Sequence, residues 1–233
     1  MKKNIFIMGS EGVIGSKISS AFEDDFNVFK FDYQLGHDFT KEEVLIDIFE
    51  SNTCFGLINL YAINEHVGKA NQAKSYQDFS LEDMKNSFDI NVISLFNVCR
   101  YFCKYNDSGS VINFSSIYGL RPPDNNLYEG DNMKSISYAV SKSSVIPLTK
   151  YFAKNIPNDQ LRFNVIAPGG VYDNQDTLFV EKYSNKVPLK RMCMAEDLIE
   201  PIKFLLAEGS SYINGIVLPL SLIHISEPTR QFA

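Results

Sequence analysis

A tyrosine and a lysine are the residues of this sequence best suited to proton transfer. Tyr138 and Lys142 lie in the string SYAVSK, and a spacing of four residues puts both side chains on one face of a helix. A free phenol ionises near pH 10, so work near neutral pH needs its pKa lowered by about 2–3 units. A lysine cation one turn away can contribute to that stabilisation. Because such pairs are also commonplace on amphipathic helices, the surrounding elements must decide what the pair does.

A serine ends the strand that precedes this helix. Ser116 lies in GSVINFSSIYG, after a predicted buried strand at 111–114. Ligands of open parallel sheets sit at the carboxyl ends of the strands, so Ser116 could donate a hydrogen bond to a substrate carbonyl. The adjacent Ser115 is the alternative.

A glycine-rich turn predicts a nucleotide site near the start of the chain. The string MGSEGVIG contains Gly9, Gly12, Ile14 and Gly15 between a predicted strand and helix. Glycines there permit a tight turn and close approach of a pyrophosphate to the helix amino end. Asp32 follows about 20 residues later and could accept hydrogen bonds from both adenosine ribose hydroxyls, which predicts NAD rather than NADP. A plain structural turn and an ordinary acid at a strand end are the alternatives.

Strands and helices alternate along the chain and would position these groups. Short apolar runs predict strands, and helical periodicity predicts intervening helices of ten or more residues. This alternation predicts an α/β fold with a Rossmann-like doubly wound parallel sheet and helices on both faces. The predicted strands are 4–8, 26–31, 55–60, 111–114, 161–167 and 216–218, and the main helices are 13–22, 41–50, 80–105, 137–154 and 196–207.

Composition narrows the possible partners. The 233 residues are 45% hydrophobic and carry a formal charge of -6, which argues against a general nucleic-acid binder or a protein of anionic membranes. No apolar run approaches the length of a membrane span, and the run after Lys2 and Lys3 is too short for a signal peptide. The expected location is therefore cytoplasmic.

The four cysteines are sparse, and Cys99 with Cys103 has no further ligand nearby, so no metal site is predicted.

Several ordered motifs resemble the short-chain dehydrogenase/reductase family. The likeness covers residues 4 to about 218. GSVINFSS resembles the family's strand with its catalytic serine, SYAVSK its YxxxK helix, and FDINVISLF the helix with its catalytic asparagine. RFNVIAPGG resembles its PG motif, and PLKRMCMAEDLIEPIKFLLAEGSSYINGIVL resembles the closing helix and strand. Several motifs in this order are far more specific than any one of them.

The resemblance implies roles for four catalytic residues. Tyr138 would be the general acid/base, and Ser116 would orient and stabilise the reacting oxygen. Lys142 would bind the nicotinamide ribose and, together with an oxidised nicotinamide, lower the pKa of Tyr138. Asn91 would hold a water that links Lys142 to solvent, the alternative being an ordinary helix surface residue.

The resemblance also extends the predicted cofactor site. Asp38 in HDFT resembles the family's aspartate near the adenine, and Asn59 resembles the first asparagine of its NNAG segment. The turn at Pro168 and Gly169 should face the nicotinamide. For Asn59, a structural tie between strands is the alternative.

The sequence departs from the common family pattern at three places. Met8 and the GxxGxxG spacing are typical of the extended sugar-nucleotide branch, and the bulky Tyr61 replaces a small residue near the cofactor. Extra residues within 121–135 should bulge above the active site, where a polar segment suits a hydroxyl-rich substrate. The polar segment 171–191 takes the place of the family's substrate lid.

Further strings, among them SSIYG and YEG, resemble bacterial dehydrogenases of flagellin or surface-sugar modification. This resemblance implies a sugar or nucleotide sugar as substrate. Arg121 or Lys190 could contact an anionic group, although both could also be solvated surface charges. A homodimer or homotetramer is a further expectation from the family.

The last residues do not fit the family pattern. After Leu218 the string SLIHISEPTRQ resembles translated sequencing-adaptor read-through. We therefore expect one domain at 1–220 and a non-native tail at 221–233, the alternative being a genuine lineage-specific tail.

The leading prediction is an NAD-dependent oxidoreductase that interconverts a carbonyl and a secondary alcohol on a sugar-like compound. A catalytically impaired dinucleotide-binding or scaffold protein is one alternative, motivated by the altered NNAG segment. A sugar-nucleotide epimerase or dehydratase is another, favoured by the glycine spacing but not by the short chain.

Overall fold

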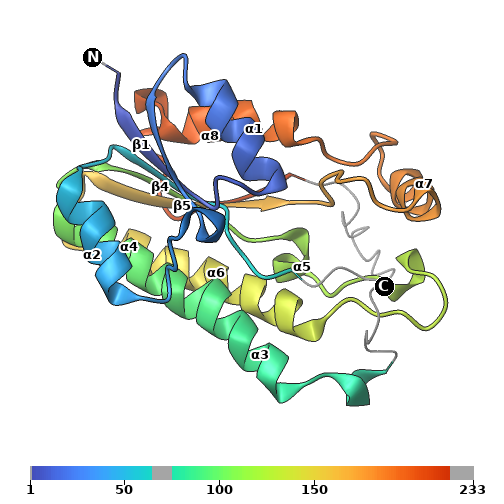
Figure 1. Ribbon diagram of the computed structural model, residues 1–233. Coiled ribbons are helices and arrows are strands. Elements are labelled where there is room, and N and C mark those ends of the chain that lie inside the picture. Colours follow the sequence, from blue (N-terminus) through green and yellow to red (C-terminus); the bar gives the residue numbers. More distant parts are fainter. Residues whose placement is uncertain (1, 65–74, 221–233) are drawn as a thin grey trace, which may run out of the picture.

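Six parallel strands form the centre of the molecule in the computed structural model (Figure 1), which describes residues 2–64 and 75–220. The strand order is β2-β1-β3-β4-β5-β6, and every neighbouring pair is parallel. The strands are β1 (Asn4–Met8), β2 (Asn27–Phe31), β3 (Gly56–Asn59), β4 (Gly109–Phe114), β5 (Leu161–Pro168) and β6 (Val217–Leu220). This arrangement confirms the predicted doubly wound Rossmann-like sheet.

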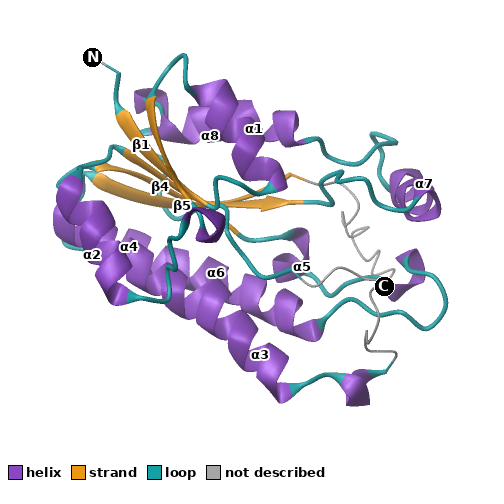
Figure 2. Ribbon diagram, viewed as in Figure 1, coloured by secondary structure: helices purple, strands orange, loops and turns teal. Residues whose placement is uncertain are grey.

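Helices cover both faces of the sheet (Figure 2). One face is packed by α1 and α8, and the other by α2, α4 and α6. The bounds are α1 (Val13–Phe22), α2 (Glu42–Ser51), α3 (Leu81–Phe88), α4 (Ser94–Tyr105), α5 (Ile117–Leu120), α6 (Ile136–Asn155), α7 (Thr177–Lys186) and α8 (Ile199–Leu206). Within the described ranges, no helix is long and apolar enough to cross a membrane.

Two apolar cores lie on the two faces because the strands are apolar on both sides. Phe6 and Leu57 point to the core beneath α2, α4 and α6, whereas Ile5 and Ile58 point to the core beneath α1 and α8. Successive strand residues alternate between faces, and β4 is buried along its whole length. Apolar runs of this kind are typical of parallel sheets covered on both faces.

The predicted long helix at 80–105 is interrupted. A π-helical turn, Asp89–Ile93, separates α3 from α4 and contains Asn91. A π-turn widens the helix locally and is often found at functional sites. The helical periodicity of the sequence did not reveal it.

The register brings the strand ends to one edge of the sheet. Met8 of β1 pairs with Asn59 of β3, and Asn59 pairs with Asn113 of β4. The chain leaves β1 toward β2 on one side and returns to β3 on the other, so the crevice of the fold lies between β1 and β3. Ligands of open α/β sheets bind at this switch point. The expected tail at 221–233 lies outside the described residues, and a single domain at 1–220 stays a prediction.

Candidate active site

The turn between β1 and α1 is held by close contacts between backbone atoms. Gly9 has a φ of +90°, a conformation that L side chains rarely adopt. A Cβ at Gly15 would lie 2.0 Å from the carbonyl oxygen of Gly9, which is far inside van der Waals contact. The chain can therefore make this turn only with glycine at both positions.

The amino end of α1 is open at this turn. Gly12 is the N-cap of α1 and offers no side chain to bond the first N–H groups. Nearby, Asp32 begins the segment after β2, and its carboxylate accepts hydrogen bonds from the backbone N–H groups of Glu11 (3.1 Å) and Gln34 (2.9 Å). An uncapped helix amino end suits a phosphate group, and a carboxylate held beside the glycine turn suits ribose hydroxyls. These residues fit a dinucleotide.

The two candidate serines have different partners. Ser115 Oγ donates to the backbone oxygen of Lys142 at 2.7 Å and is buried. Ser116 caps α5, its Oγ accepting from the N–H of Tyr118 at 3.2 Å, and its hydroxyl is near enough to the Tyr138 phenol to act on the pKa of that group. Ser116 therefore lines the same cavity as Tyr138, while Ser115 fastens β4 to α6.

Lys142 is buried beneath Tyr138. Its Nζ donates to the backbone oxygen of Phe114, the last residue of β4, at 2.7 Å, and only 4% of the residue is exposed. Burial lowers the pKa of Lys142 from 10.5 to about 8, because removal from water disfavours the ammonium form.

The pKa of Tyr138 differs from the sequence-based expectation. Burial raises it above its ordinary value of 10, and the hydrogen bond with Ser116 only opposes that rise. The expectation that Lys142 lowers the pKa of Tyr138 is therefore corrected for the protein without cofactor. Desolvation of the phenol has the larger effect on that pKa, and the ammonium of Lys142 donates to the carbonyl of Phe114.

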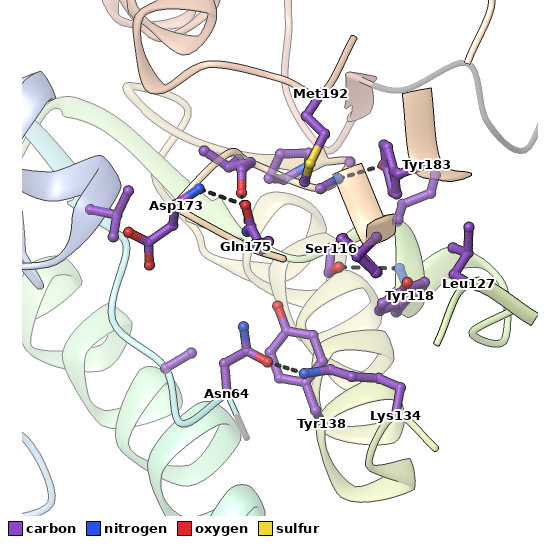
Figure 3. Close-up of a pocket in the computed structure, with 18 of the residues that line it drawn as sticks. Asn64, Ser116, Tyr118, Leu127, Lys134, Tyr138, Asp173, Gln175, Tyr183 and Met192 are labelled. Carbon is purple, nitrogen blue, oxygen red and sulfur yellow. Dashed lines mark hydrogen bonds between the residues drawn. The ribbon is translucent and has the colours of Figure 1, made fainter. Parts of the chain in front are cut away.

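A cavity of about 680 Å³ connects these groups (Figure 3). Its size suits a small molecule or part of a cofactor. The predicted residues that line it are Gly12, Ile14, Ser116, Tyr138, Lys142, Pro168 and Gly169. Gly9, Gly15, Asp32 and Asp38 lie outside this lining, on the side of β1 and β2. The Asp38 carboxylate accepts from the N–H and the hydroxyl of Thr40, and the hydroxyl bond, the largest cause, lowers its pKa.

The extra residues and the predicted lid segment form the outer walls of the cavity. Tyr128 of the extra segment stacks on Phe179 of α7 with 5.4 Å between ring centroids, and its hydroxyl is 3.1 Å from that of Tyr118. Tyr183 of α7 accepts a hydrogen bond from the N–H of Gly170 at 2.6 Å. The predicted bulge above the site is thus confirmed, and the facing wall is aromatic.

Two predicted anion contacts are not at the cavity. Neither Arg121 nor Lys190 is among its lining residues, whereas Lys134 and Asn64 are. Lys134 is buried, donates to Asn64 Oδ1, and has its Nζ 4.8 Å from the centroid of the Tyr138 ring (Figure 3). The sequence showed Lys134 only as one of many polar residues before the helix, so no pattern distinguished it.

Asn91 is buried rather than on a helix surface. Its side chain accepts from the N–H of Ile63 at 2.8 Å and donates to the oxygen of Ile63 at 3.1 Å and to Ser141 Oγ at 2.9 Å. It thereby fastens the segment after β3 to α6, next to Lys142. The water relay assigned to Asn91 stays a prediction.

Asn59 and Tyr61 lie beside the cavity but do not line it. Asn59 Nδ2 donates to Asn113 Oδ1 at 2.7 Å, and the residue is 2% exposed. Its side chain therefore ties β3 to β4, as the alternative had it, and its assignment to the cofactor stays a prediction. The ring of Tyr61 packs against that of Phe39 at a tilt of 51° with centroids 4.7 Å apart, and its hydroxyl is 2.9 Å from Ser94 Oγ. The bulky side chain is thus accommodated in the helix layer.

The doubly wound sheet and the cavity at its carboxyl edge define a Rossmann-like α/β protein. A family model described as enoyl-(acyl carrier protein) reductase matches residues 36–221. The chain therefore belongs to the short-chain dehydrogenase/reductase family. The matched range begins after the glycine turn, which is where the sequence departs from the common pattern.

Two bacterial proteins are similar to part of the chain. It is 33% identical over 168 residues to post-translational flagellin modification protein A of Campylobacter coli, covering 70% of this chain and 64% of that protein. It is 34% identical over 147 residues to a 3-oxoacyl-[acyl-carrier-protein] reductase of Chlamydia trachomatis, covering 60% and 55%. The chain thus spans 55–64% of the length of these relatives.

A solved structure is similar over almost the whole chain. It is a short-chain dehydrogenase of Leptospira borgpetersenii with bound NAD+, 25% identical, with a TM-score of 0.84 and coverage of 95% of this chain and 92% of that one.

Proposed function

We propose that this protein is an NAD-dependent oxidoreductase that interconverts a carbonyl and a secondary alcohol on a sugar or a sugar-derived compound. One observation carries the proposal: Ser116, Tyr138 and Lys142 line one cavity together with residues at the amino end of α1. A protein that only binds a dinucleotide has no need of this set.

The proposed chemistry divides between the cofactor and the chain. Bound NAD would supply hydride transfer to or from the reacting carbon. Tyr138 gives a proton to the carbonyl oxygen in reduction and takes it from the alcohol in oxidation. Ser116 donates a hydrogen bond to the same oxygen and fixes its position. Lys142 binds the ribose next to the nicotinamide and favours the ionised form of Tyr138 when the cofactor is bound.

The assignment of NAD depends on Asp32. Its carboxylate is fixed by two backbone N–H groups, so a 2'-phosphate beside it would meet a negative charge. The NAD+ in the similar Leptospira structure supports this assignment. We expect NADH to bind at least about tenfold more tightly than NADPH, a difference of about 1.4 kcal/mol. Fluorescence titration with both nucleotides measures it, and tighter binding of NADPH would remove the role of Asp32.

The substrate assignment depends on the outer wall. The stacked rings of Tyr128 and Phe179 offer an apolar face, while Gln175 and Asp173 offer amide and carboxylate groups on the same cavity (Figure 3). A polyhydroxylated ring has both kinds of surface. The similarity to a flagellin modification protein supports the same substrate class.

Exposed apolar side chains support the expected pairing of two copies through the long helices. Phe96 of α4 is 42% exposed, and Tyr151 of α6 is 63% exposed. A second copy of the chain would remove these rings from water.

The decisive experiment is the substitution Tyr138→Phe, assayed with NADH against keto-sugars and keto nucleotide sugars. We expect kcat to fall at least about 1000-fold, because no other group replaces the proton donor, while the Kd for NADH stays within about twofold. Tyr151→Phe, an exposed tyrosine on the same helix, is the matched control and should keep full activity. Undiminished turnover in Tyr138→Phe would remove the mechanism. NADH binding without turnover of any carbonyl compound would favour the binding or scaffold alternative.

A further inference from the structure

Lys134 is a buried cation that the proposed mechanism does not use. It lies at the end of the extra segment, two residues before α6 begins at Ile136, and is 8% exposed. Its Nζ is 4.8 Å from the centroid of the Tyr138 ring. Long charged side chains are rarely buried to this degree without a partner that holds them.

The surroundings of Lys134 fix its ammonium at that place. Nζ donates to the amide oxygen of Asn64, from the segment after β3. The backbone N–H of Lys134 donates to Asn125 Oδ1 at 3.4 Å, which joins the two ends of the extra segment. Asn64 therefore holds the ammonium beside the Tyr138 ring, and Asn125 holds the backbone that carries it.

A cation over a ring face acts differently on the two forms of a phenol. It attracts the neutral ring by about 0.5–2 kcal/mol. It attracts the phenolate more strongly because that form carries a full negative charge on its oxygen and ring carbons, and opposite charges attract more strongly in a protein interior than in water. The difference between these attractions favours ionisation of the phenol.

We propose that Lys134 is a positioning residue that holds a second ammonium group against Tyr138 and stabilises its phenolate. In the protein without cofactor, Lys142 does not stabilise the phenolate in this way, because its Nζ donates to the carbonyl of Phe114. The extra segment thus brings to the active site a charge that offsets part of the cost of burying Tyr138. The effect on ionisation needs no catalysis; its consequence for turnover rests on the proposed function.

Other ionisable groups face Tyr138 and act in both directions. Lys142 on α6 favours the phenolate only while it is protonated, below its pKa of about 8. The phenols of Tyr118 and Tyr128, when ionised, would oppose it, as their mutual electrostatic influence with Tyr138 shows. Carboxylates on the same cavity would also oppose it; they are Glu129, Asp173 and Asp176. The test must therefore change the charge at residue 134 and leave these groups in place.

The experiment measures the ionisation of Tyr138 directly in the full chain without substrate. Tyrosine labelled with 13C at Cζ is titrated by NMR, and the Tyr138 signal is assigned by its loss in Tyr138→Phe. We expect Lys134→Met to raise the pKa of Tyr138 by about 1 unit or more, a tenfold or greater fall in its ionisation constant. Lys134→Arg keeps the charge and should stay within about 0.3 units of the parent protein.

The matched control is Lys150→Met, which removes an exposed lysine from α6, the helix that carries Tyr138. It changes the net charge equally and should leave the Tyr138 pKa within about 0.3 units, since an exposed charge far along the helix is screened. A Tyr138 pKa unchanged by Lys134→Met, or shifted as much by Lys150→Met, would overturn the proposal.

Two further measurements separate this proposal from the proposed function. If Lys134→Met does not fold, Asn64→Leu removes the acceptor that holds the ammonium and keeps the lysine. A smaller rise in the Tyr138 pKa supports the proposal, and no rise overturns it.

In an active enzyme, the acidic limb of kcat/KM for alcohol oxidation should move up in pH by the same amount as the NMR midpoint. Because the titration uses neither cofactor nor substrate, it can succeed when turnover fails and fail when turnover is intact.

Discussion

The nucleotide side and the substrate side of this molecule are built from different parts. On the nucleotide side, Gly9 and Gly15 bring backbone against backbone directly after β1, and Asp32 is held by backbone N–H groups. On the substrate side, Tyr128 of the extra segment and Tyr183 of α7 each pack against the ring of Phe179, so the contacts are made by side chains.

This difference predicts different tolerance to change. Backbone contacts cannot relax without moving a strand or a helix, whereas side chains on surface segments can adopt other rotamers. The nucleotide side should therefore accept little variation. The substrate side can vary without loss of the fold, which is how a single family can act on many substrates.

The largest effect is expected for Gly15→Ala, which tests the rigid side. Its Cβ would lie 2.0 Å from Gly9 O, so α1 must shift away from the turn. We expect a loss of about 4 kcal/mol or more in the free energy of unfolding and at least about 100-fold weaker NADH binding. Urea unfolding and fluorescence titration measure both. Gly209→Ala, where a Cβ meets nothing within 4 Å, should change stability by less than about 0.5 kcal/mol. Equal effects of the two substitutions would refute the idea of a rigid turn.

Lys142 lies between the two sides, and its burial should have an intermediate effect. With its pKa lowered from 10.5 to about 8 by desolvation, the unfolded chain binds one proton more than the folded protein between these pH values. The contribution of Lys142 to stability therefore rises with pH across that window and is unfavourable below pH 8. Lys142→Met should be more stable than the parent at pH 7 by roughly 2–3 kcal/mol, and the difference should shrink toward zero by pH 10.5. Urea unfolding of both proteins at several pH values tests this; a Met variant less stable at pH 7 would contradict it.

The smallest effect on stability is expected for Gly170→Ala on the substrate side. A Cβ there would lie 3.0 Å from Met192 Cε and from the ring of Tyr183. Because Met192 can change rotamer, we expect a loss of about 1 kcal/mol or less. KM for the carbonyl substrate should rise a few-fold, while the Kd for NADH stays the same. Steady-state kinetics gives KM, and a parallel NADH titration gives the Kd for NADH. A larger change in the Kd than in KM would contradict the difference between the nucleotide side and the substrate side.

Sequence patterns predicted the fold and seven of the residues that line the cavity, because these follow from local periodicity and short motifs. The alternation of apolar strands with amphipathic helices was sufficient for the sheet, and the four-residue spacing was sufficient to put Tyr138 and Lys142 on one face. Ser116 followed from its position after β4. The π-turn at Asn91 was not predicted, and the tie made by Asn59 was only the alternative for that residue, since the partners of both side chains are distant in the chain: Ser141 for Asn91 and Asn113 for Asn59.

The sequence by itself determined the doubly wound sheet, the glycine turn and the family motifs, because each depends on residues that are close together in the chain. Only the tertiary structure decided that Lys134 faces the Tyr138 ring, that Lys142 bonds the end of β4, and that burial raises the pKa of Tyr138. Charge and burial at a site are sums over side chains from many segments. They are set only when the strands and the loops after them have come together.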